Sequence, residues 1–211
     1  MRARTGPQEQ AKKAREETRA YFALAQKFLA PATPLLIAIG GLSGSGKSAV
    51  ARAIAPSLGA FPGAVHVRSD VERKRLFGVA QSEKLPAHAY VPEVSDQVYA
   101  MCRKRALMAL SSGQAVIVDA VHAKPEERAA LATLTSRLGI RFTGLWLEAP
   151  AAIMQDRVAT RLGDISDATP SVVDAQLGYA IGPQSFAVID ASLPLNQVVA
   201  ACLKRIGARG A

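Results

Sequence analysis

The stretch GLSGSGKS, residues 41–48, decides the fold of this chain. It matches the pattern G-x-x-x-x-G-K-S/T and lies between a short apolar run, 35–39, and the helix-forming residues 49–54. Glycine lets the backbone fold around phosphate oxygens with its N–H groups pointing inward, and the helix that follows adds its positive N-terminal end. The stretch therefore predicts a phosphate-binding loop of the Walker A type between a strand and a helix.

Two positions of this loop have specific predicted tasks. Lys47 is expected to bridge the β- and γ-phosphates, and the Ser48 hydroxyl to be a ligand of Mg²⁺, so the sequence implies ATP and Mg²⁺ as cofactors. A Gly/Ser turn with a stray lysine is the alternative, and the flanking strand and helix argue against it. Nucleotide contacts are expected from Gly41, Leu42, Ser43, Gly44, Ser45, Gly46, Lys47, Ser48 and Ala49.

The composition suits one folded α/β domain. The chain has 211 residues, of which 49% are hydrophobic, enough for a full core. No apolar run reaches the ~20 residues of a membrane-spanning helix, and the N-terminal segment lacks the apolar core of a secretory signal. Cys102 and Cys202 lack metal-ligand spacing and fit a reducing cytosol. We therefore expect a cytoplasmic protein without membrane contact.

The net charge of +9 is unevenly distributed. Residues 1–30 carry almost half of the excess of Lys and Arg over Asp and Glu. The remainder is a modest positive field, as expected where a polyanionic nucleotide is held. This field is compatible with nucleic acid as a partner but does not require one.

Short apolar segments alternate with helix-forming segments along the chain. This alternation predicts an α/β fold of the P-loop NTPase class, a parallel five-stranded sheet with helices on both faces and an N-terminal helical extension. We expect the extension in residues 1–31 and one domain in 32–211. Strands are expected near 35–39, 64–70, 115–119, 141–147 and 186–189, and helices near 7–30, 49–54, 71–77, 93–110, 125–138, 151–162, 171–179 and 195–206.

The N-terminal extension is basic and carries an apolar stripe in its second half. The stripe recurs at helical spacing and consists of Tyr21, Phe22, Ala25, Phe28 and Leu29. It predicts a helix packed against the domain. A partner-binding or linker helix is the alternative.

Asp70 and Arg73 follow the second predicted strand. In open parallel sheets ligands bind beyond the carboxyl ends of the strands, so this segment is expected at the site. Transfer of a phosphoryl group to an alcohol needs a carboxylate that accepts the hydroxyl proton. Asp70 fits that role, and Arg73 could hold an anionic or polar part of the acceptor. Capping of the next helix is the other interpretation of Asp70.

Asp119 ends the most apolar predicted strand, at the Walker B position. There a carboxylate reaches Mg²⁺ directly or through water. Contact with the acceptor is the alternative function, which would leave the metal to Ser48, and capping or packing is the structural alternative. His122, just beyond, could face the acceptor, but we expect a solvent-exposed loop position.

Arg157 and Arg161 are expected at i and i+4 on one helix face, before a polar, Asp-rich segment, 163–170. This arrangement suits a lid whose arginines move onto the γ-phosphate when the site closes. Ordinary surface arginines are the alternative. The basic triplets 73–75 and 103–105 could contact nucleic-acid phosphates, although such runs are usually solvated faces.

With these residues assembled, the chain resembles the adenylate-kinase-type P-loop kinases. Residues 41–48, 68–76 (RSDVERKRL) and 144–150 (GLWLEAP) resemble a bacterial group of AAA-type ATP-binding proteins. In that group the kinase-like domain is often fused behind an aminoglycoside-phosphotransferase-like domain, and we expect no such domain in these 211 residues. The resemblance covers about residues 30–206 and does not specify a substrate.

The arrangement is also similar to polynucleotide 5′-hydroxyl kinases, gluconate kinases and chloramphenicol phosphotransferases. In the polynucleotide kinases an aspartate and an arginine spaced like Asp70 and Arg73 are the base and the acceptor contact. We therefore expect an ATP-dependent phosphotransferase that acts on a hydroxyl of a small polar acceptor. A polynucleotide 5′-hydroxyl kinase and a non-catalytic ATP-binding regulatory module are the alternatives. ATP or GTP, the identity of the acceptor and the oligomeric state stay open.

Overall fold

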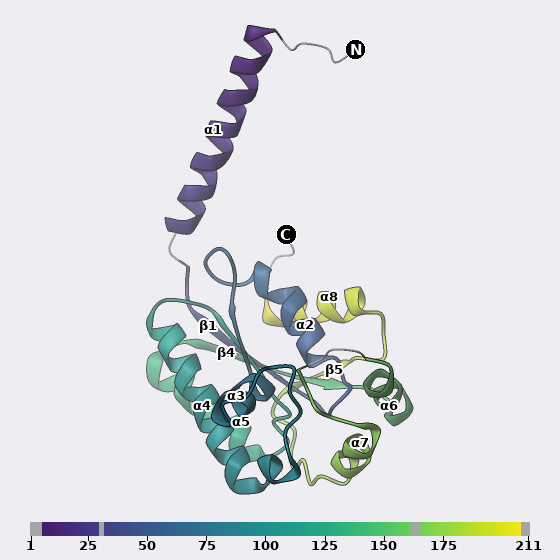
Figure 1. Cartoon of the computed structure of the whole chain (residues 1–211). Coiled ribbons are helices and arrows are strands. Elements are labelled where there is room, and N and C mark those ends of the chain that lie inside the picture. Colours follow the sequence, from purple (N-terminus) through teal and green to yellow (C-terminus); the bar gives the residue numbers. More distant parts are fainter. Residues whose placement is uncertain (1–5, 30–31, 162–164, 208–211) are drawn as a thin grey trace.

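The computed structural model describes residues 6–29, 32–161 and 165–207. Strands and helices alternate after the first helix, as the sequence predicts (Figure 1). The strands are β1 (Leu35–Gly40), β2 (Val65–Arg68), β3 (Val116–Asp119), β4 (Arg141–Glu148) and β5 (Ala187–Asp190). The helices are α1 (Pro7–Leu29), α2 (Lys47–Ile54), α3 (Ser69–Leu76), α4 (Pro92–Ser111), α5 (Pro125–Leu138), α6 (Ala151–Thr160), α7 (Pro170–Leu177) and α8 (Leu195–Ile206), with short 3-10 turns η1 (Ala55–Ser57) and η2 (Ala87–Tyr90).

The sheet has five parallel strands in the order β2-β3-β1-β4-β5, which confirms the predicted fold class. β1 lies in the middle, and its Ile39 is in register with Asp119 of β3 and Leu145 of β4. Because the strands are parallel, their carboxyl ends lie along one edge of the sheet. The loop after β1 and the ends of β2 and β3 are therefore neighbours.

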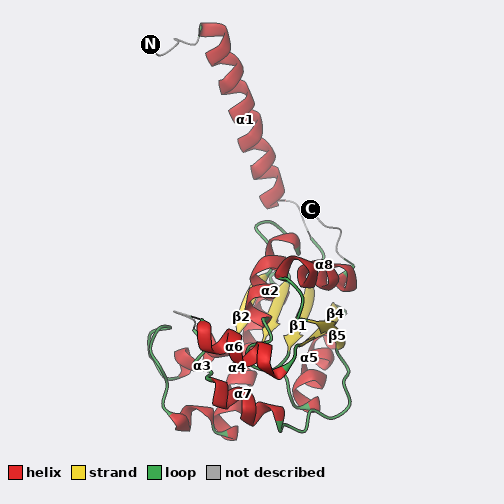
Figure 2. Ribbon diagram, turned by 90° about the vertical axis from the view of Figure 1, so that its right-hand side faces the viewer, coloured by secondary structure: helices red, strands yellow, loops and turns green. Residues whose placement is uncertain are grey.

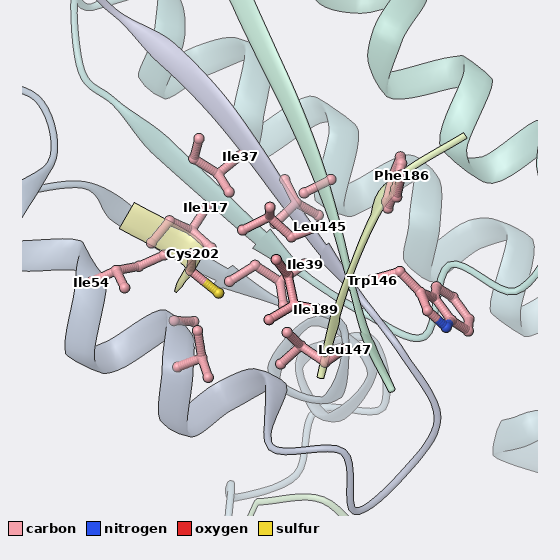
Figure 3. Packing of buried hydrophobic residues seen from close by; sticks show 14 of the residues in the cluster. Ile37, Ile39, Ile54, Ile117, Leu145, Trp146, Leu147, Phe186, Ile189 and Cys202 are labelled. Atoms are coloured by element: carbon pink, nitrogen blue, oxygen red, sulfur yellow. The ribbon is translucent and has the colours of Figure 1, made fainter. Parts of the chain in front are cut away.

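The core lies on both faces of this sheet. All six residues of β1 are buried, as a central parallel strand requires. α2 and α8 pack together on one face, whereas α3, α4 and α5 cover the other (Figures 1 and 2). Figure 3 shows Ile54 and Cys202 of the first helix pair beside Ile39 and Ile117 of the sheet. The helices thus cover both faces, as predicted.

The prediction that the N-terminal helix packs on the domain is wrong. α1 extends away from the domain (Figures 1 and 2), and its large apolar side chains are exposed, with Tyr21 at 74% and Phe22 at 68%. Phe28 makes an edge-to-face contact with Phe61 at 4.6 Å between ring centroids. Since other helices already cover both faces of the sheet, no open face is left for the stripe of α1.

A buried arginine ties two loops together at the site edge of the sheet. Arg128 of α5 is 1% exposed. Its Nη1 donates to the carbonyl oxygens of His122 and Ala123 at 2.8 and 2.7 Å. Its Nη2 donates to the carbonyl oxygens of Ile181 and Pro183 at 2.8 and 2.9 Å. One guanidinium therefore joins the segment after β3 to the segment after α7.

We expect Arg128→Ala to lower the free energy of unfolding by about 3 kcal/mol or more, because it leaves several carbonyl oxygens without a donor. Urea unfolding followed by circular dichroism measures the change. Arg137→Ala, at an exposed position of the same helix, is the control and should change stability by about 0.5 kcal/mol or less. Equal effects of the two substitutions would contradict this role of Arg128.

Candidate active site

The phosphate loop runs from the end of β1 to the first turn of α2. Gly41, Gly44 and Gly46 all have positive φ, at 137°, 81° and 94°. A Cβ atom on Gly44 would lie 2.3 Å from the carbonyl oxygen of Met154 in α6, so the loop is pressed closely against that helix. Only glycine satisfies both the backbone conformation and this close approach.

Lys47 lies across its own loop. Its Nζ donates to the carbonyl oxygen of Leu42 at 2.9 Å. Burial lowers the pKa of Lys47, while the charges of Asp119 and Asp70 act in the opposite direction. The ammonium group is therefore held between the loop and two carboxylates.

Asp119, at the end of β3, is 4% exposed and collects polar partners from two elements. Its Oδ2 accepts a hydrogen bond from the Ser48 hydroxyl at 2.5 Å and lies 3.1 Å from Nε2 of His66 and 3.6 Å from Nε of Arg68. Burial acts to raise the pKa of Asp119, but the hydrogen bonds of His66 and Ser48 and the charge of Lys47 hold it below its usual value. The carboxylate is therefore ionised at neutral pH.

His66 and Arg68 were not among the predicted site residues. They stand two positions apart on β2, so their side chains lie on the same face of the strand. Arg68 is in register with Asp119 on the neighbouring strand. The alternation along β2 was visible in the sequence, but the pairing of β2 with β3 was needed to place these two side chains beside Asp119.

Ser48 and Asp119 could hold Mg²⁺. Mg²⁺ is usually bound by one or two protein oxygens, with phosphate oxygens and water completing its shell. The residues described contain no group of three or more His, Cys, Asp or Glu side chains that could form an all-protein metal cage. One hydroxyl and one ionised carboxylate beside a phosphate loop thus fit a metal that arrives with a nucleotide.

Asp70 lies in the first turn of α3, directly after β2. Burial and the nearby charge of Asp119 raise its pKa, while Lys47, Arg68 and a hydrogen bond with Ser166 act to lower it. Asp70, just after β2, and Asp119, at the end of β3, therefore differ in acidity. The environment favours proton uptake at Asp70 and ionisation at Asp119.

Arg73, one turn further along α3, is engaged inside the protein. Its Nη1 donates to the carbonyl oxygen of Ala89 at 2.5 Å and its Nη2 to the Ser95 hydroxyl at 3.3 Å. The guanidinium also lies over the ring of Tyr90, 4.8 Å from the centroid. Arg73 thus joins α3 to η2 and α4 at the wall of the site.

Lys74 is 2% exposed. Its ammonium group donates to the carbonyl oxygens of Gln81 and Glu83 at 3.0 and 2.7 Å and to Oδ1 of Asp167 at 3.0 Å. The sequence offered two interpretations of the basic triplet 73–75: contact with nucleic-acid phosphates, or a solvated face. Neither interpretation holds for Arg73 and Lys74. Both are buried because internal oxygens surround them.

The predicted lid arginines lie beside the loop, but α6 ends at Thr160, so Arg161 is just past the helix rather than on its face. Nη1 of Arg157 lies 3.9 Å from the position that a Cβ atom on Gly46 would take. Nη2 of Arg161 donates to the carbonyl oxygen of Ala168 at 3.1 Å. Residues 162–164, the start of the predicted lid segment, lie outside the described residues.

One cavity of ≈ 930 Å³ brings these groups together. Lys47, Asp70, Asp119, Arg157 and Arg161 all line it. Sequence reasoning missed further lining residues on α4, on α7 and just past α7: Tyr99, Val172, Gln176 and Tyr179. No local motif marks them, because they reach the cavity only through the packing of α4 and α7.

His122 is buried rather than exposed, which corrects the expectation for this residue. It is 1% exposed, its ring lies 5.5 Å from that of Tyr99 and 5.9 Å from that of Phe186, and its backbone N–H donates to the Tyr99 hydroxyl at 3.0 Å. Burial lowers its pKa to about 4. The backbone turns at His122 with φ 51°, which directs the side chain inward.

Comparison with known proteins agrees with this geometry. The family model described as "AAA domain" matches residues 36–183. The uncharacterized protein Rv2004c of Mycobacterium tuberculosis is 31% identical over 156 residues, which are 72% of this chain and 30% of that protein. The chain thus spans under a third of the length of this relative.

Two solved structures share the fold. A gluconokinase of Sinorhizobium meliloti has a TM-score of 0.58 and 22% identity, over 82% of this chain and 92% of its own. An APS kinase of Mycobacterium tuberculosis in complex with AMPPNP and APS has a TM-score of 0.61 and 17% identity, over 85% of this chain and all of its own. At these identities the likeness establishes the α/β P-loop fold. Among the described residues, none of the helices has the length and apolarity to cross a membrane.

Lys47→Ala should weaken binding of Mg·AMPPNP by about tenfold or more, because a charge-assisted contact to phosphate is lost. The fold should survive, since the side chain bonds only to its own loop. Isothermal titration calorimetry measures the affinity. Lys204→Ala, at an exposed position of α8, is the control, and unchanged affinity in Lys47→Ala would refute the assignment.

His122 should make folding stability depend on pH. Its pKa is about 4 when folded and near 6.5 when exposed, so the unfolded chain takes up a proton between these values. The free energy of unfolding should therefore fall as the pH drops from 6.5 to 4. His122→Asn removes the titrating ring and tolerates positive φ, so its stability should fall less steeply over this range.

Urea unfolding at several pH values measures the slope for His122→Asn. The exposed His88 supplies the control variant His88→Asn, which should keep the wild-type slope. A wild-type slope in both variants would contradict the burial of a neutral imidazole.

Proposed function

The chain belongs to the AAA domain family, and on this premise we propose that it is a Mg·ATP-dependent kinase that transfers the γ-phosphate to a hydroxyl of a small polar acceptor. The observation that carries the proposal is that one cavity contains both the phosphate loop and Asp70. A buried carboxylate of raised pKa in that cavity is suited to accept a proton from an alcohol. A module that only binds nucleotide has no need of such a group.

In this scheme each side chain has one task. Lys47 and the loop amides hold the triphosphate, while Ser48 and Asp119 would hold Mg²⁺. When bound, the metal supplies positive charge that neutralises the phosphate oxygens. Arg157 and Arg161 balance the charge that develops on the transferred group. We assign these roles to residues of the P-loop domain, 32–211, and none to the N-terminal extension, 1–31.

Asp70 is assigned the role of general base. A base is most effective when its pKa approaches the working pH, and burial moves Asp70 in that direction. Asp119 remains ionised beside it because hydrogen bonds and Lys47 stabilise its charge. The two carboxylates can thus act separately, one on the proton and one on the metal.

Several basic side chains near Asp70 form ion pairs within the protein, which favours a small acceptor over a polynucleotide. Lys74 is buried against Asp167, and Arg75 and Arg105 both pair with Glu72. Binding to a nucleic-acid backbone needs lysines and arginines that are available to phosphates. These partners reduce the number of available cations near Asp70.

The proposed function is tested by ATP consumption with Mg²⁺ across a panel of acceptors: sugars, sugar acids, aminoglycosides, nucleosides and 5′-hydroxyl oligonucleotides. Stimulation by one small-molecule class, with a phosphorylated product of the expected mass, supports the proposal. Stimulation by oligonucleotides alone assigns the protein to polynucleotide kinases. Tight ATP binding without any stimulation favours a regulatory module.

We expect Asp70→Asn to reduce transfer about 10²–10⁴-fold, the usual contribution of a general base. Nucleotide affinity should change little, since the loop is intact. In the wild type the rate should fall as the pH drops through the raised pKa of Asp70, because the ionised form is the base. Asp190→Asn, at the exposed end of β5, is the control. Transfer at the wild-type rate in Asp70→Asn would refute the role.

A further inference from the structure

A buried glutamine on α7 contacts the phosphate loop. Gln176 is 7% exposed, and its Oε1 accepts a hydrogen bond from the backbone N–H of Ser43 at 2.7 Å. The two residues are 133 positions apart, so the contact exists only in the folded chain. Because Ser43 contributes a donor, the atom of Gln176 that faces it must be the carbonyl oxygen. This bond determines the orientation of the side-chain amide.

The other end of the same amide is an NH₂ group, which is a donor. Gln176 lines the cavity, and its Nε2 has no hydrogen-bond partner among residues 6–29, 32–161 and 165–207. An amide NH₂ group carries two N–H donors. The two N–H groups of Gln176 are therefore available to a bound ligand.

The position of Ser43 indicates which part of a nucleotide would meet this donor. In loops of this kind the lysine reaches the β- and γ-phosphates. Nζ of Lys47 donates to the carbonyl oxygen of Leu42, the residue before Ser43, and Asp70 and Arg161 line the same cavity. The contact of Gln176 with Ser43 therefore lies beside the part of the loop that a β- or γ-phosphate would meet.

We propose that Gln176 contacts the γ-phosphate. Its Nε2 donates to a γ-phosphoryl oxygen while its Oε1 holds the Ser43 amide in place. The residue then distinguishes a triphosphate from a diphosphate and connects the loop to α7, whose Val172 and Ala175 line the same cavity. The inference rests on the proposed function, because it requires that a nucleotide occupy the loop.

The test compares the affinities for Mg·AMPPNP and Mg·ADP, measured by calorimetry, in the wild type and two variants. Gln176→Glu keeps an oxygen for Ser43 but replaces the donor with a negative charge, and Gln176→Leu removes both. Each variant should lose about tenfold or more in the preference for AMPPNP over ADP, the usual effect of losing a hydrogen bond to a charged group. Gln176→Glu should bind ADP within about twofold of the wild type.

Gln155→Leu is the matched control. Gln155 of α6 donates to Asp174 of α7 at 2.5 Å, so it ties α7 to α6 as Gln176 ties α7 to the loop, but it does not line the cavity. This variant should keep the wild-type preference for AMPPNP. If Gln176→Leu does not fold, as judged by circular dichroism, the affinities of Gln176→Glu for AMPPNP and ADP decide the test.

Two results would overturn the inference. An equal loss of AMPPNP and ADP affinity would show that Gln176 only braces the loop, and an unchanged preference in both variants would show no contact at all. A wild type that binds neither nucleotide would overturn the inference together with the proposed function. A selective loss in the variants, in a protein that no acceptor stimulates, would support the role of Gln176 and reject the kinase.

Discussion

The hydrogen bond between the Ser48 hydroxyl and Asp119 is the interaction on which the site depends. It joins residues 71 positions apart at a distance of 2.5 Å, and it exists because β1 and β3 are neighbours in the sheet. The same arrangement brings Lys47 close enough to Asp119 for their charges to act on each other. A phosphate loop without this neighbour would have glycine and lysine but no ionised carboxylate to complete a metal site.

The distribution of charge follows from burial rather than from composition. The chain carries a net charge of +9, yet Arg73 and Lys74, which stand beside Asp70 on α3, are enclosed by internal oxygens. These two cations have a structural role, because their partners inside the protein join α3 to the segments around η2. Arg157 and Arg161 are among the cations that line the cavity, and in the proposed function they meet the γ-phosphate.

Helices α6 and α7 both contact the phosphate loop. Met154 of α6 packs against Gly44, and Gln176 of α7 holds the amide of Ser43. Asp167, between the two helices, accepts hydrogen bonds from Lys74, the backbone of Leu85 and the Tyr90 hydroxyl. Helices α6 and α7, with Asp167 between them, are thus connected to the phosphate loop on one side and to α3 and η2 on the other.

The sequence by itself determined the phosphate loop, the α/β class and the strand end at Asp119, because those signals are local: a spaced motif and short apolar runs. The expected strand of residues 64–70 ends at Arg68, and Asp70 lies in the first turn of α3. The assignment of roles to these residues remains a prediction. Only the tertiary structure decided the strand order, the placement of His66 and Arg68 on Asp119, the burial of His122, the exposure of α1 and the contact of Gln176 with the loop. These features depend on which segments pack side by side, and a linear pattern cannot show which of many distant segments becomes a neighbour.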